Sequence, residues 1–165
     1  MVSSHLIPSS TPPAASPASI TLPSHSPIST FIRSSPRSHD DDDACHCLFG
    51  ATLDHAVSQI FHLTLTNKSM VQLHAQSFIF QLTLFVVPSS DLFTFPPAVF
   101  RASVTHLIEM ADSSSCSFLV MAINKHIAAV GALLRAFSYF GFVIVSPSAY
   151  GHTPSHLLIG YTLDH

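Results

Sequence analysis

The spacing of apolar residues changes twice between positions 118 and 145. Residues 118–123 form an uninterrupted apolar run of strand length. The large apolar residues that follow recur every three or four positions: Ile127, Val130, Leu134 and Phe137. That spacing lines one side of a helix, and residues 142–145 are again aromatic or β-branched. The pattern predicts a strand, a helix and a strand, in which a right-handed crossover joins two parallel, buried strands.

Both ends of this helix carry local signals. The side chain of Asn124 can accept a hydrogen bond from the N–H groups of a first helical turn, so the helix should begin near Lys125 or His126. Gly141 supplies the left-handed backbone position that ends a helix. We therefore expect a helix of about four turns.

An earlier strand is predicted at residues 78–87, where apolar side chains occupy both faces and Pro88 stops the pairing. In this register Phe78 and Leu84 point to one face of the sheet and Phe85 points to the other. Two further strands are expected, one after Ile60 and one at 157–163.

A second helix is predicted to begin at Pro96 and Pro97, because a first helical turn has no use for the N–H group that proline lacks. It should run to about Asp112. Its apolar stripe, which would lie on the sheet, is Phe100, Val104, Leu107, Ile108 and Ala111. Its polar face carries Arg101, Thr105, Glu109 and Asp112. Taken alone, this face is typical of a solvated helix surface with weak charge pairing.

The N-terminal part has a different composition. Residues 1–39 are dominated by Ser and Pro, which cannot bury enough surface to offset the entropy of ordering, and residues 40–43 are four consecutive Asp. We divide the chain into a disordered leader with an acidic linker at 1–47, a poorly defined lead-in at 48–75 and an α/β domain at 76–165. Cys45 and Cys47 have no second ligand pair at zinc-site spacing, so no metal is expected.

Composition narrows the classes of function. Charged residues are only 9%, apolar residues are 47% and the net charge is −3, so no basic field points to nucleic acid. Three unevenly spaced Cys suit a reducing compartment. No signal peptide is visible, and the most apolar stretch, 78–87, has the length of a strand rather than of a transmembrane helix.

The second half of the chain resembles a known family in several linked blocks. The run GALLRAFSYFGFVIVSP at 131–147 resembles the C-terminal signature of the ornithine decarboxylase antizymes, in which Ala-Leu-Leu-Arg-Thr-Phe-Ser-Phe-Leu-Gly-Phe-Glu-Ile-Val-x-Pro occupies this place. Four further blocks are similar to family segments in the same order: LFVVP at 84–88, LIEMAD at 107–112, NKH at 124–126 and GYTLD at 160–164. The resemblance covers about residue 82 to the end, and it fades over 44–75.

The resemblance implies a fold and a binding surface. The fold would be α/β, with a mixed β-sheet and two packed helices as in the acyl-CoA N-acyltransferase-like fold of antizymes, preceded by the disordered leader. Five charged residues coincide with family positions at or beside the surface that meets the decarboxylase: Arg101, Glu109, Asp112, Lys125 and Arg135. The resemblance assigns them to partner binding.

The resemblance also implies a function. Antizymes bind the ornithine decarboxylase monomer, block its homodimer and deliver it to the proteasome without ubiquitin, which lowers polyamine synthesis, and they depress polyamine uptake. Expression through a programmed ribosomal frameshift is typical of them. We accordingly expect an enzyme inhibitor without a cofactor, in the cytoplasm and secondarily in the nucleus.

The chain departs from the family pattern at three places. Residues 127–130 replace a charged Arg-Glu-Asp-Arg segment, Val143 stands where the family has Glu, and residues 152–155 replace a basic pair before the last strand. These changes keep the apolar registers, and they alter the charges on which the strength and salt dependence of binding rest.

Two other classes of function are alternatives to an enzyme inhibitor. An acyl-CoA-dependent N-acyltransferase-like enzyme would need a glycine-rich pyrophosphate loop between strand and helix, which residues 123–127 lack, and no Gly-x-Ser-x-Gly motif occurs. The best acid or base candidates are His106, His126 and His156, and none lies in a readable catalytic motif. A small membrane-associated protein is the other alternative, which the polar interruptions of the apolar runs disfavour.

Overall fold

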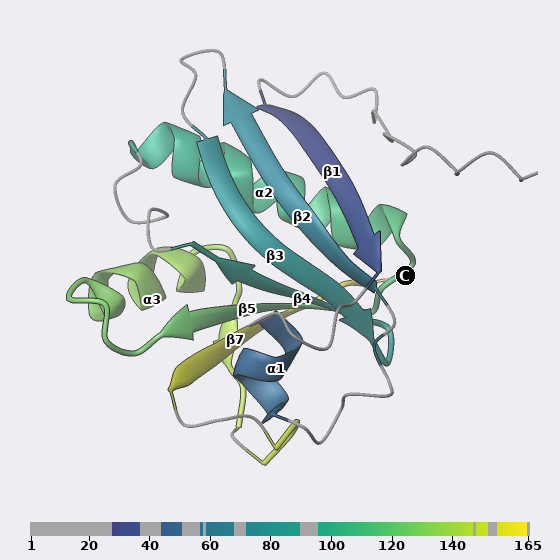
Figure 1. Ribbon diagram of the computed structural model, residues 1–165. Helices are drawn as coiled ribbons and strands as arrows, with labels where there is room; N and C mark the ends of the chain where they lie inside the picture. Colours follow the sequence, from purple (N-terminus) through teal and green to yellow (C-terminus); the bar gives the residue numbers. More distant parts are fainter. Residues whose placement is uncertain are drawn as a thin grey trace, which may run out of the picture.

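The computed structural model describes residues 28–36, 44–50, 57, 59–67, 72–89, 96–146, 148–151 and 155–164. Within them, one seven-stranded mixed sheet carries three helices (Figure 1). The strands are β1 (Ile28–Pro36), β2 (Gln59–Asn67), β3 (Gln72–Phe80), β4 (Thr83–Pro88), β5 (Phe118–Asn124), β6 (Val143–Ile144) and β7 (His156–Thr162). The helices are α1 (Ala44–Phe49), α2 (Pro97–Ser113) and α3 (Val130–Ser138). The predicted α/β class with a mixed sheet is confirmed.

The order of strands in the sheet is β1-β2-β3-β4-β5-β7-β6. The first four strands form an antiparallel meander, and α2 then returns the chain so that β5 lies parallel to β4. The last strand in sequence, β7, lies between β5 and β6 and is antiparallel to both. β1 and β6 are therefore the two edges of the sheet.

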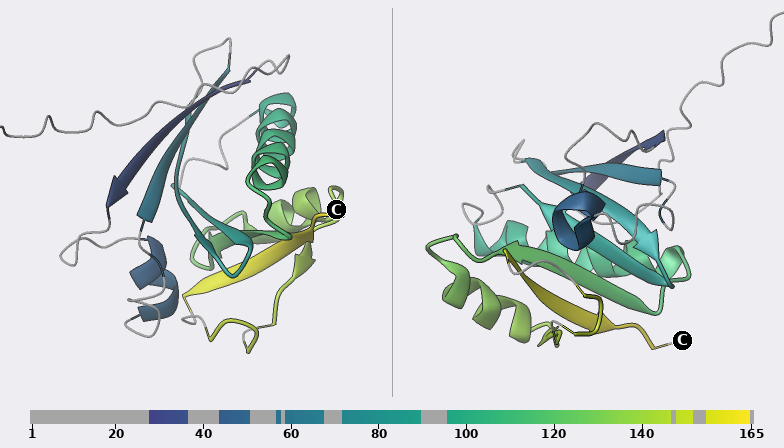
Figure 2. Two further views of the ribbon diagram at one scale, coloured as in Figure 1. Left: turned by 90° about the vertical axis from the view of Figure 1, so that its right-hand side faces the viewer. Right: turned by 60° about the horizontal axis from the view of Figure 1, so that its bottom comes forward.

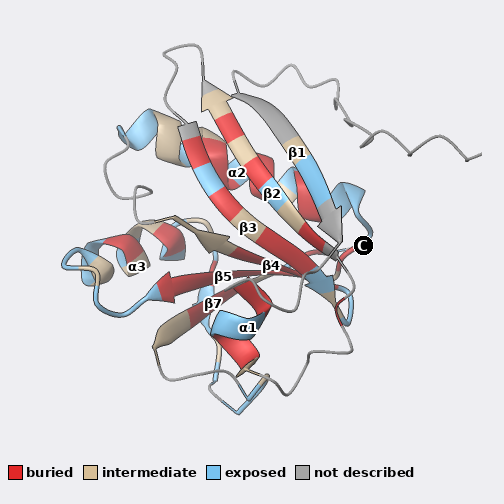
Figure 3. Ribbon diagram, in the orientation of Figure 1, coloured by how far each residue is buried: buried red, intermediate tan, exposed pale blue. Residues whose placement is uncertain are grey.

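Helices cover both faces of the sheet (Figure 2). On one face, α2 and α3 bury their apolar sides against alternate residues of the strands, among them Leu84, Leu119 and Ile123. On the other face, the short helix α1 buries Leu48 and Phe49 against the remaining alternate residues. Burial on two faces explains why the central strands read as continuous apolar runs (Figure 3).

Several expected elements are confirmed. α2 begins at Pro97 after Pro96 and ends at Ser113, and residues of the predicted stripe, such as Val104 and Leu107, are buried against the sheet. The strand after Ile60 is β2, and the strand predicted at 157–163 is β7. Gly141 adopts the left-handed conformation with φ +88°. Within the described residues, every helix is too short or too polar to span a bilayer.

The single strand predicted at 78–87 is wrong, because the chain turns in its middle. Gln81 and Leu82 both have positive φ, 48° and 56°, and join β3 to β4 as a tight hairpin. Phe78 and Phe85 pair across the hairpin on the same face, with stacked rings whose centroids are 5.0 Å apart. The prediction that they point to opposite faces was therefore also wrong.

The crossover after β5 also differs from the prediction. The Asn124 side chain accepts a hydrogen bond from the backbone N–H of His126 at 2.9 Å, which closes a turn rather than beginning the helix. α3 starts only at Val130 and has nine residues. β5 and β6 run parallel, but β7 lies between them, and β6 is a two-residue exposed edge strand rather than a buried one.

Part of the expected leader belongs to the fold. β1 pairs along its whole length with β2, and the N–H group of Ala44 at the start of α1 donates to Gln76 Oε1 of β3 at 2.8 Å. Disorder across 1–47 is thus the wrong expectation for these two elements. An edge strand needs only one partner strand, which supplies its hydrogen bonds whatever its own β-propensity. Residues 1–27 and 37–43 lie outside the described residues.

Candidate partner-binding surface

Helix α2 carries three of the five predicted site residues, and all three are exposed. Arg101 lies in the N-terminal part of the helix, whereas Glu109 and Asp112 lie near its C-terminus. At a rise of about 1.5 Å per residue, Arg101 is about 12 Å from Glu109 along the helix axis. The helix therefore displays its positive and negative charges at opposite ends.

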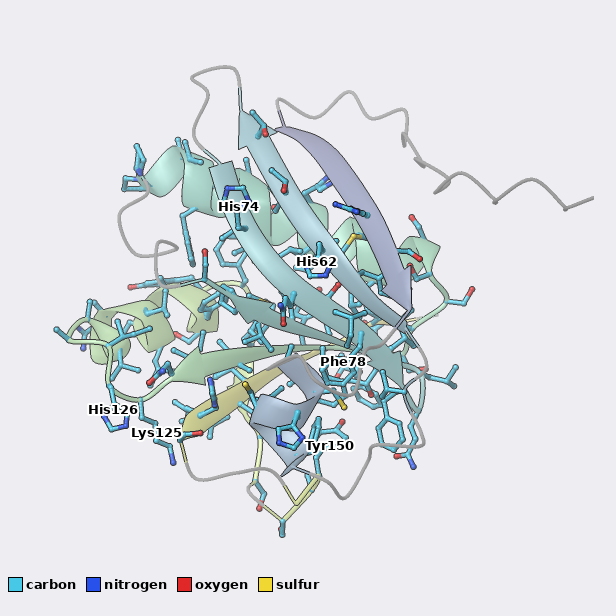
Figure 4. The ribbon with its side chains drawn as sticks, viewed as in Figure 1. His62, His74, Phe78, Lys125, His126 and Tyr150 are labelled. Atoms are coloured by element: carbon cyan, nitrogen blue, oxygen red, sulfur yellow. The ribbon has the colours of Figure 1, made fainter. Side chains whose placement is uncertain are left out.

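Lys125 and Arg135 lie at the same end of the molecule as Arg101. α2 returns from the end of β4 to the start of β5, so its N-terminus lies beside the end of β5, where Lys125 follows in an exposed turn (Figure 4). Arg135 is exposed on α3. The ring of Phe100 in α2 lies 5.1 Å from that of Phe137 in α3, so the N-terminal half of α2 packs directly against α3.

The described acidic residues gather at the opposite end. Glu109 and Asp112 are there, and Asp164 joins them because the N–H of Leu163 donates to the carbonyl of Ser117, just before β5, at 2.9 Å. The structure thus brings three of the predicted residues to a basic end and two to an acidic end. It does not gather all five into one patch.

Large apolar side chains are exposed where α3 leads into β6. Tyr139, Val143 and Ile144 have exposed fractions of 91%, 66% and 63%. They belong to a short segment that links the C-terminus of α3 to β6, which is an edge of the sheet formed by the described residues. We call Arg135, Tyr139, Val143 and Ile144 the α3–β6 surface.

Aromatic packing holds this surface from beneath. The ring of Phe142 lies 5.1 Å from that of Phe137 and 5.3 Å from that of Tyr161, so the residue between the exposed ones is buried. The left-handed Gly141 turns the chain from α3 into β6. The three exposed apolar residues are therefore held in place by the core, rather than carried on a loose loop.

The segment after β6 lies closely on β7. The N–H of Val145 donates to the carbonyl of Leu158 at 2.9 Å. A Cβ atom added to Gly160 would lie 2.9 Å from Val145 Cγ2, which is closer than real Cβ contacts come. Because Gly160 has no side chain, Val145 can pack directly on β7, next to the edge strand β6.

The three histidines considered as acids or bases have different surroundings. His106 belongs to α2 and is only 3% exposed. Its Nδ1 atom lies 3.6 Å from Glu109 Oε2. Burial lowers the pKa of His106 below its ordinary value of 6.5, and the nearby Glu109 carboxylate offsets part of that shift. His126 is exposed, and His156 Nδ1 lies 3.0 Å from Ser155 Oγ.

The described residues offer neither a grouped set of metal ligands nor conditions that favour a reactive Cys116 thiolate. No three His, Cys, Asp or Glu side chains are grouped to hold a metal ion in the part of the chain that the structure describes. Cys116 is buried, and burial raises the pKa of its thiol, which disfavours the reactive thiolate.

Sequence reasoning missed the three apolar members of the α3–β6 surface, because it placed 142–145 in a buried strand. One signal was available. The run is only four residues long and lies between Gly141 and Pro147, which suits a short edge strand better than a central one.

Comparison with protein families gives a match to the model described as ornithine decarboxylase antizyme over residues 54–162, which is more than half of the chain. The match spans β2 to β7 and both α2 and α3. It reaches further toward the N-terminus than the sequence blocks that resemble the family, which begin at about residue 82. β1 and α1 precede it. A search of curated proteins found no match.

Proposed function

Since the chain belongs to the ornithine decarboxylase antizyme family, we propose that it binds a subunit of ornithine decarboxylase and inhibits that enzyme. The family consists of enzyme regulators rather than enzymes, which agrees with the absence of a catalytic motif in the sequence. The observation that supports this function best is the α3–β6 surface, where apolar side chains are exposed together with the basic Arg135.

Exposed apolar side chains on a rigid frame favour a protein partner. Covering them recovers about 25 cal/mol for each Å² of apolar surface removed from water. Tyr139 and Arg135 are of the residue types that dominate binding energy at interfaces. As an edge of the sheet formed by the described residues, β6 also offers backbone groups to a partner.

The charges set the orientation of the partner. Arg101, Lys125 and Arg135 make this end of the molecule basic, and Glu109, Asp112 and Asp164 make the far end acidic. A partner with an acidic face would be steered to the basic end and repelled from the other. We therefore assign the basic end to the decarboxylase and treat the acidic end as outside the contact.

Inhibition follows from competition between two complexes. If the α3–β6 surface binds a decarboxylase monomer more tightly than a second decarboxylase monomer does, mass action shifts the decarboxylase from the active homodimer to the inhibited complex. Delivery of the captured subunit to the proteasome without ubiquitin, lower polyamine synthesis and uptake, and action in the cytoplasm and nucleus are the further parts of this proposal. They rest on family membership alone.

Charge reversal tests the assignment. The pair Arg101→Glu and Lys125→Glu should weaken capture of purified decarboxylase in a pull-down and leave the far-UV circular dichroism spectrum unchanged, because both side chains are exposed. Raising the salt concentration should reduce capture by the natural chain more than by this variant.

A matched pair at the acidic end serves as the control. Glu109→Gln with Asp112→Asn should have a much smaller effect on capture. Unaltered binding in the Arg101 and Lys125 variant would contradict the basic interface. Equal losses in both pairs would show that the contact extends along the whole of α2.

A further inference from the structure

The face of the sheet opposite α2 is only partly covered. α1 packs over its lower part, where Phe78 and Phe85 are buried. Above α1, β2 and β3 turn two imidazoles outward, those of His62 and His74 (Figure 4). Leu63 and Ala75, next to them in sequence, point to the other face and are buried against the helices, so the strand alternation fixes the outward direction of both histidines.

Strand register places polar partners around the two histidines. His62 lies opposite Gln76 and His74 lies opposite Thr64, so the two imidazoles are diagonal neighbours. Across β1, Arg33 lies opposite His62. Arg33 is exposed, and because the adjacent Ile32 packs toward α2, the Arg33 side chain emerges on the same face as the histidines.

A hollow of about 420 Å³ lies over β2, β3 and the end of β4, next to the position of Arg33 on β1. Its lining includes His62, Thr64, His74 and Gln76, together with Val87 in β4 and Ser89 just after it. Such a volume is in the range of small-molecule sites.

Two hydrogen bonds orient the lining groups. Thr64 Oγ1 lies 3.2 Å from His74 Nδ1, which leaves Nε2 of this ring as the nitrogen available to a ligand. Gln76 Oε1 accepts from the N–H of Ala44 at 2.8 Å, so its amide NH₂ group remains as a donor. The face therefore presents hydrogen-bond donors in defined positions.

The charges of this face point to an anion. β1 contributes Arg33, β2 and β3 contribute one histidine each, β4 contributes no titratable group, and α1 contributes the exposed His46 and Cys47. The acidic residues among those described, Glu109, Asp112 and Asp164, lie near α2 and the C-terminus. Arginine is a permanent cation with a planar set of donors, and an imidazole ring adds an N–H group that can donate to an anion.

We propose that the hollow lined by His62 and His74, with Arg33 beside it on β1, binds the phosphate group of a small phosphorylated molecule. A tetrahedral anion matches a guanidinium and imidazole N–H donors with amide and hydroxyl groups beside them. A metal ion is the weaker occupant, because two histidines next to an arginine supply too few ligands and the wrong charge. This site is separate from the α3–β6 surface and does not depend on the proposed function.

The test is a titration of the full chain with inorganic sulfate, followed by histidine ring resonances in NMR. The rings of His62 and His74 should shift in a saturable way as sulfate is added at constant pH. Inorganic phosphate near pH 7.5 should compete for the same two resonances.

Variants separate the contributions. Arg33→Gln should weaken sulfate binding, and His62→Gln with His74→Gln should abolish it. His126→Gln, an exposed histidine elsewhere, should leave sulfate binding unchanged. Arg33 is exposed on an edge strand, so its variant should fold even if the double histidine variant does not.

Three outcomes would overturn the proposal. One is the absence of a saturable shift at either ring. Another is an equal response of His126, which would indicate nonspecific screening by the salt. The third is binding of Zn²⁺ or Ni²⁺ by the two rings with no response to sulfate, which would make the hollow a metal site.

Discussion

The two edge strands of the sheet differ in length and in the polarity of their exposed side chains. β1 is a nine-residue edge, yet its described side chains toward solvent, Arg33 and Ser34, are polar, and it ends at Pro36, which has no N–H to donate. β6 is a two-residue edge, yet Val143 and Ile144 are apolar and exposed, with Tyr139 beside them. Exposed polar side chains on a long edge strand disfavour pairing with another chain, whereas a short apolar edge on a rigid frame is suited to one specific partner.

The largest effect should come from removing the apolar side chains of β6. Tyr139→Ser with Val143→Thr and Ile144→Thr should weaken decarboxylase binding on the order of 100-fold, because exposed aromatic and β-branched residues would carry most of the contact energy. The melting temperature should change little, since all three residues are exposed. Isothermal titration calorimetry measures the affinity.

The opposite edge provides the matched control. Arg33→Gln on β1 should leave decarboxylase affinity unchanged. A loss there, with none at β6, would reverse the comparison of the two edges.

The next effect concerns how β6 is held. Gly160→Ala should destabilise the fold by about 1–3 kcal/mol, because its Cβ would meet Val145 Cγ2 and push the edge strand away from β7. Urea denaturation measures the change. Adding Val145→Ala to the same chain should recover part of the loss, and purely additive effects of the two substitutions would argue against this contact.

The elements that sequence could predict are those whose signal is local. α2 has two prolines at its start and a helical stripe that meets the sheet, and its bounds were predicted within about a residue. The last strand was predicted at 157–163, and β7 lies within a residue of these bounds. The recognition of the family rested on blocks of this kind, and the family match confirms it.

The missed elements depend on distant partners or unusual turns. Gln81 and Leu82 form a tight turn without the Asn or Gly that such turns favour, so the pattern showed one strand where there are two. Asn124 closes a turn of its own instead of the first turn of α3. No residue near 143 indicates that β7 will insert between β5 and β6, and this insertion turns a predicted buried strand into an exposed edge.

The same limit applies to the binding surface. Helical spacing placed Arg101, Glu109 and Asp112 on one face of α2, but spacing around a helix says nothing about which end of it meets α3. The contact between Phe100 and Phe137 decides that point, and it joins residues far apart in the chain.

The smallest expected effect concerns His106, which is buried in the core rather than at either edge of the sheet. Because burial lowers the pKa of His106, the folded state binds fewer protons than the unfolded state just below pH 6.5, so stability should fall as pH drops through that value. Above it this contribution is fully present. The measurement is the difference in the pH dependence of thermal unfolding between the natural chain and His106→Gln. A variant curve parallel to that of the natural chain would contradict a buried neutral His106.

The most direct test mixes the purified chain with active ornithine decarboxylase homodimer and follows mass by analytical ultracentrifugation. We expect a one-to-one complex of this chain with a decarboxylase monomer, accompanied by loss of decarboxylase activity. A homodimer that persists at full activity beside unbound chain would contradict inhibition by capture of the monomer.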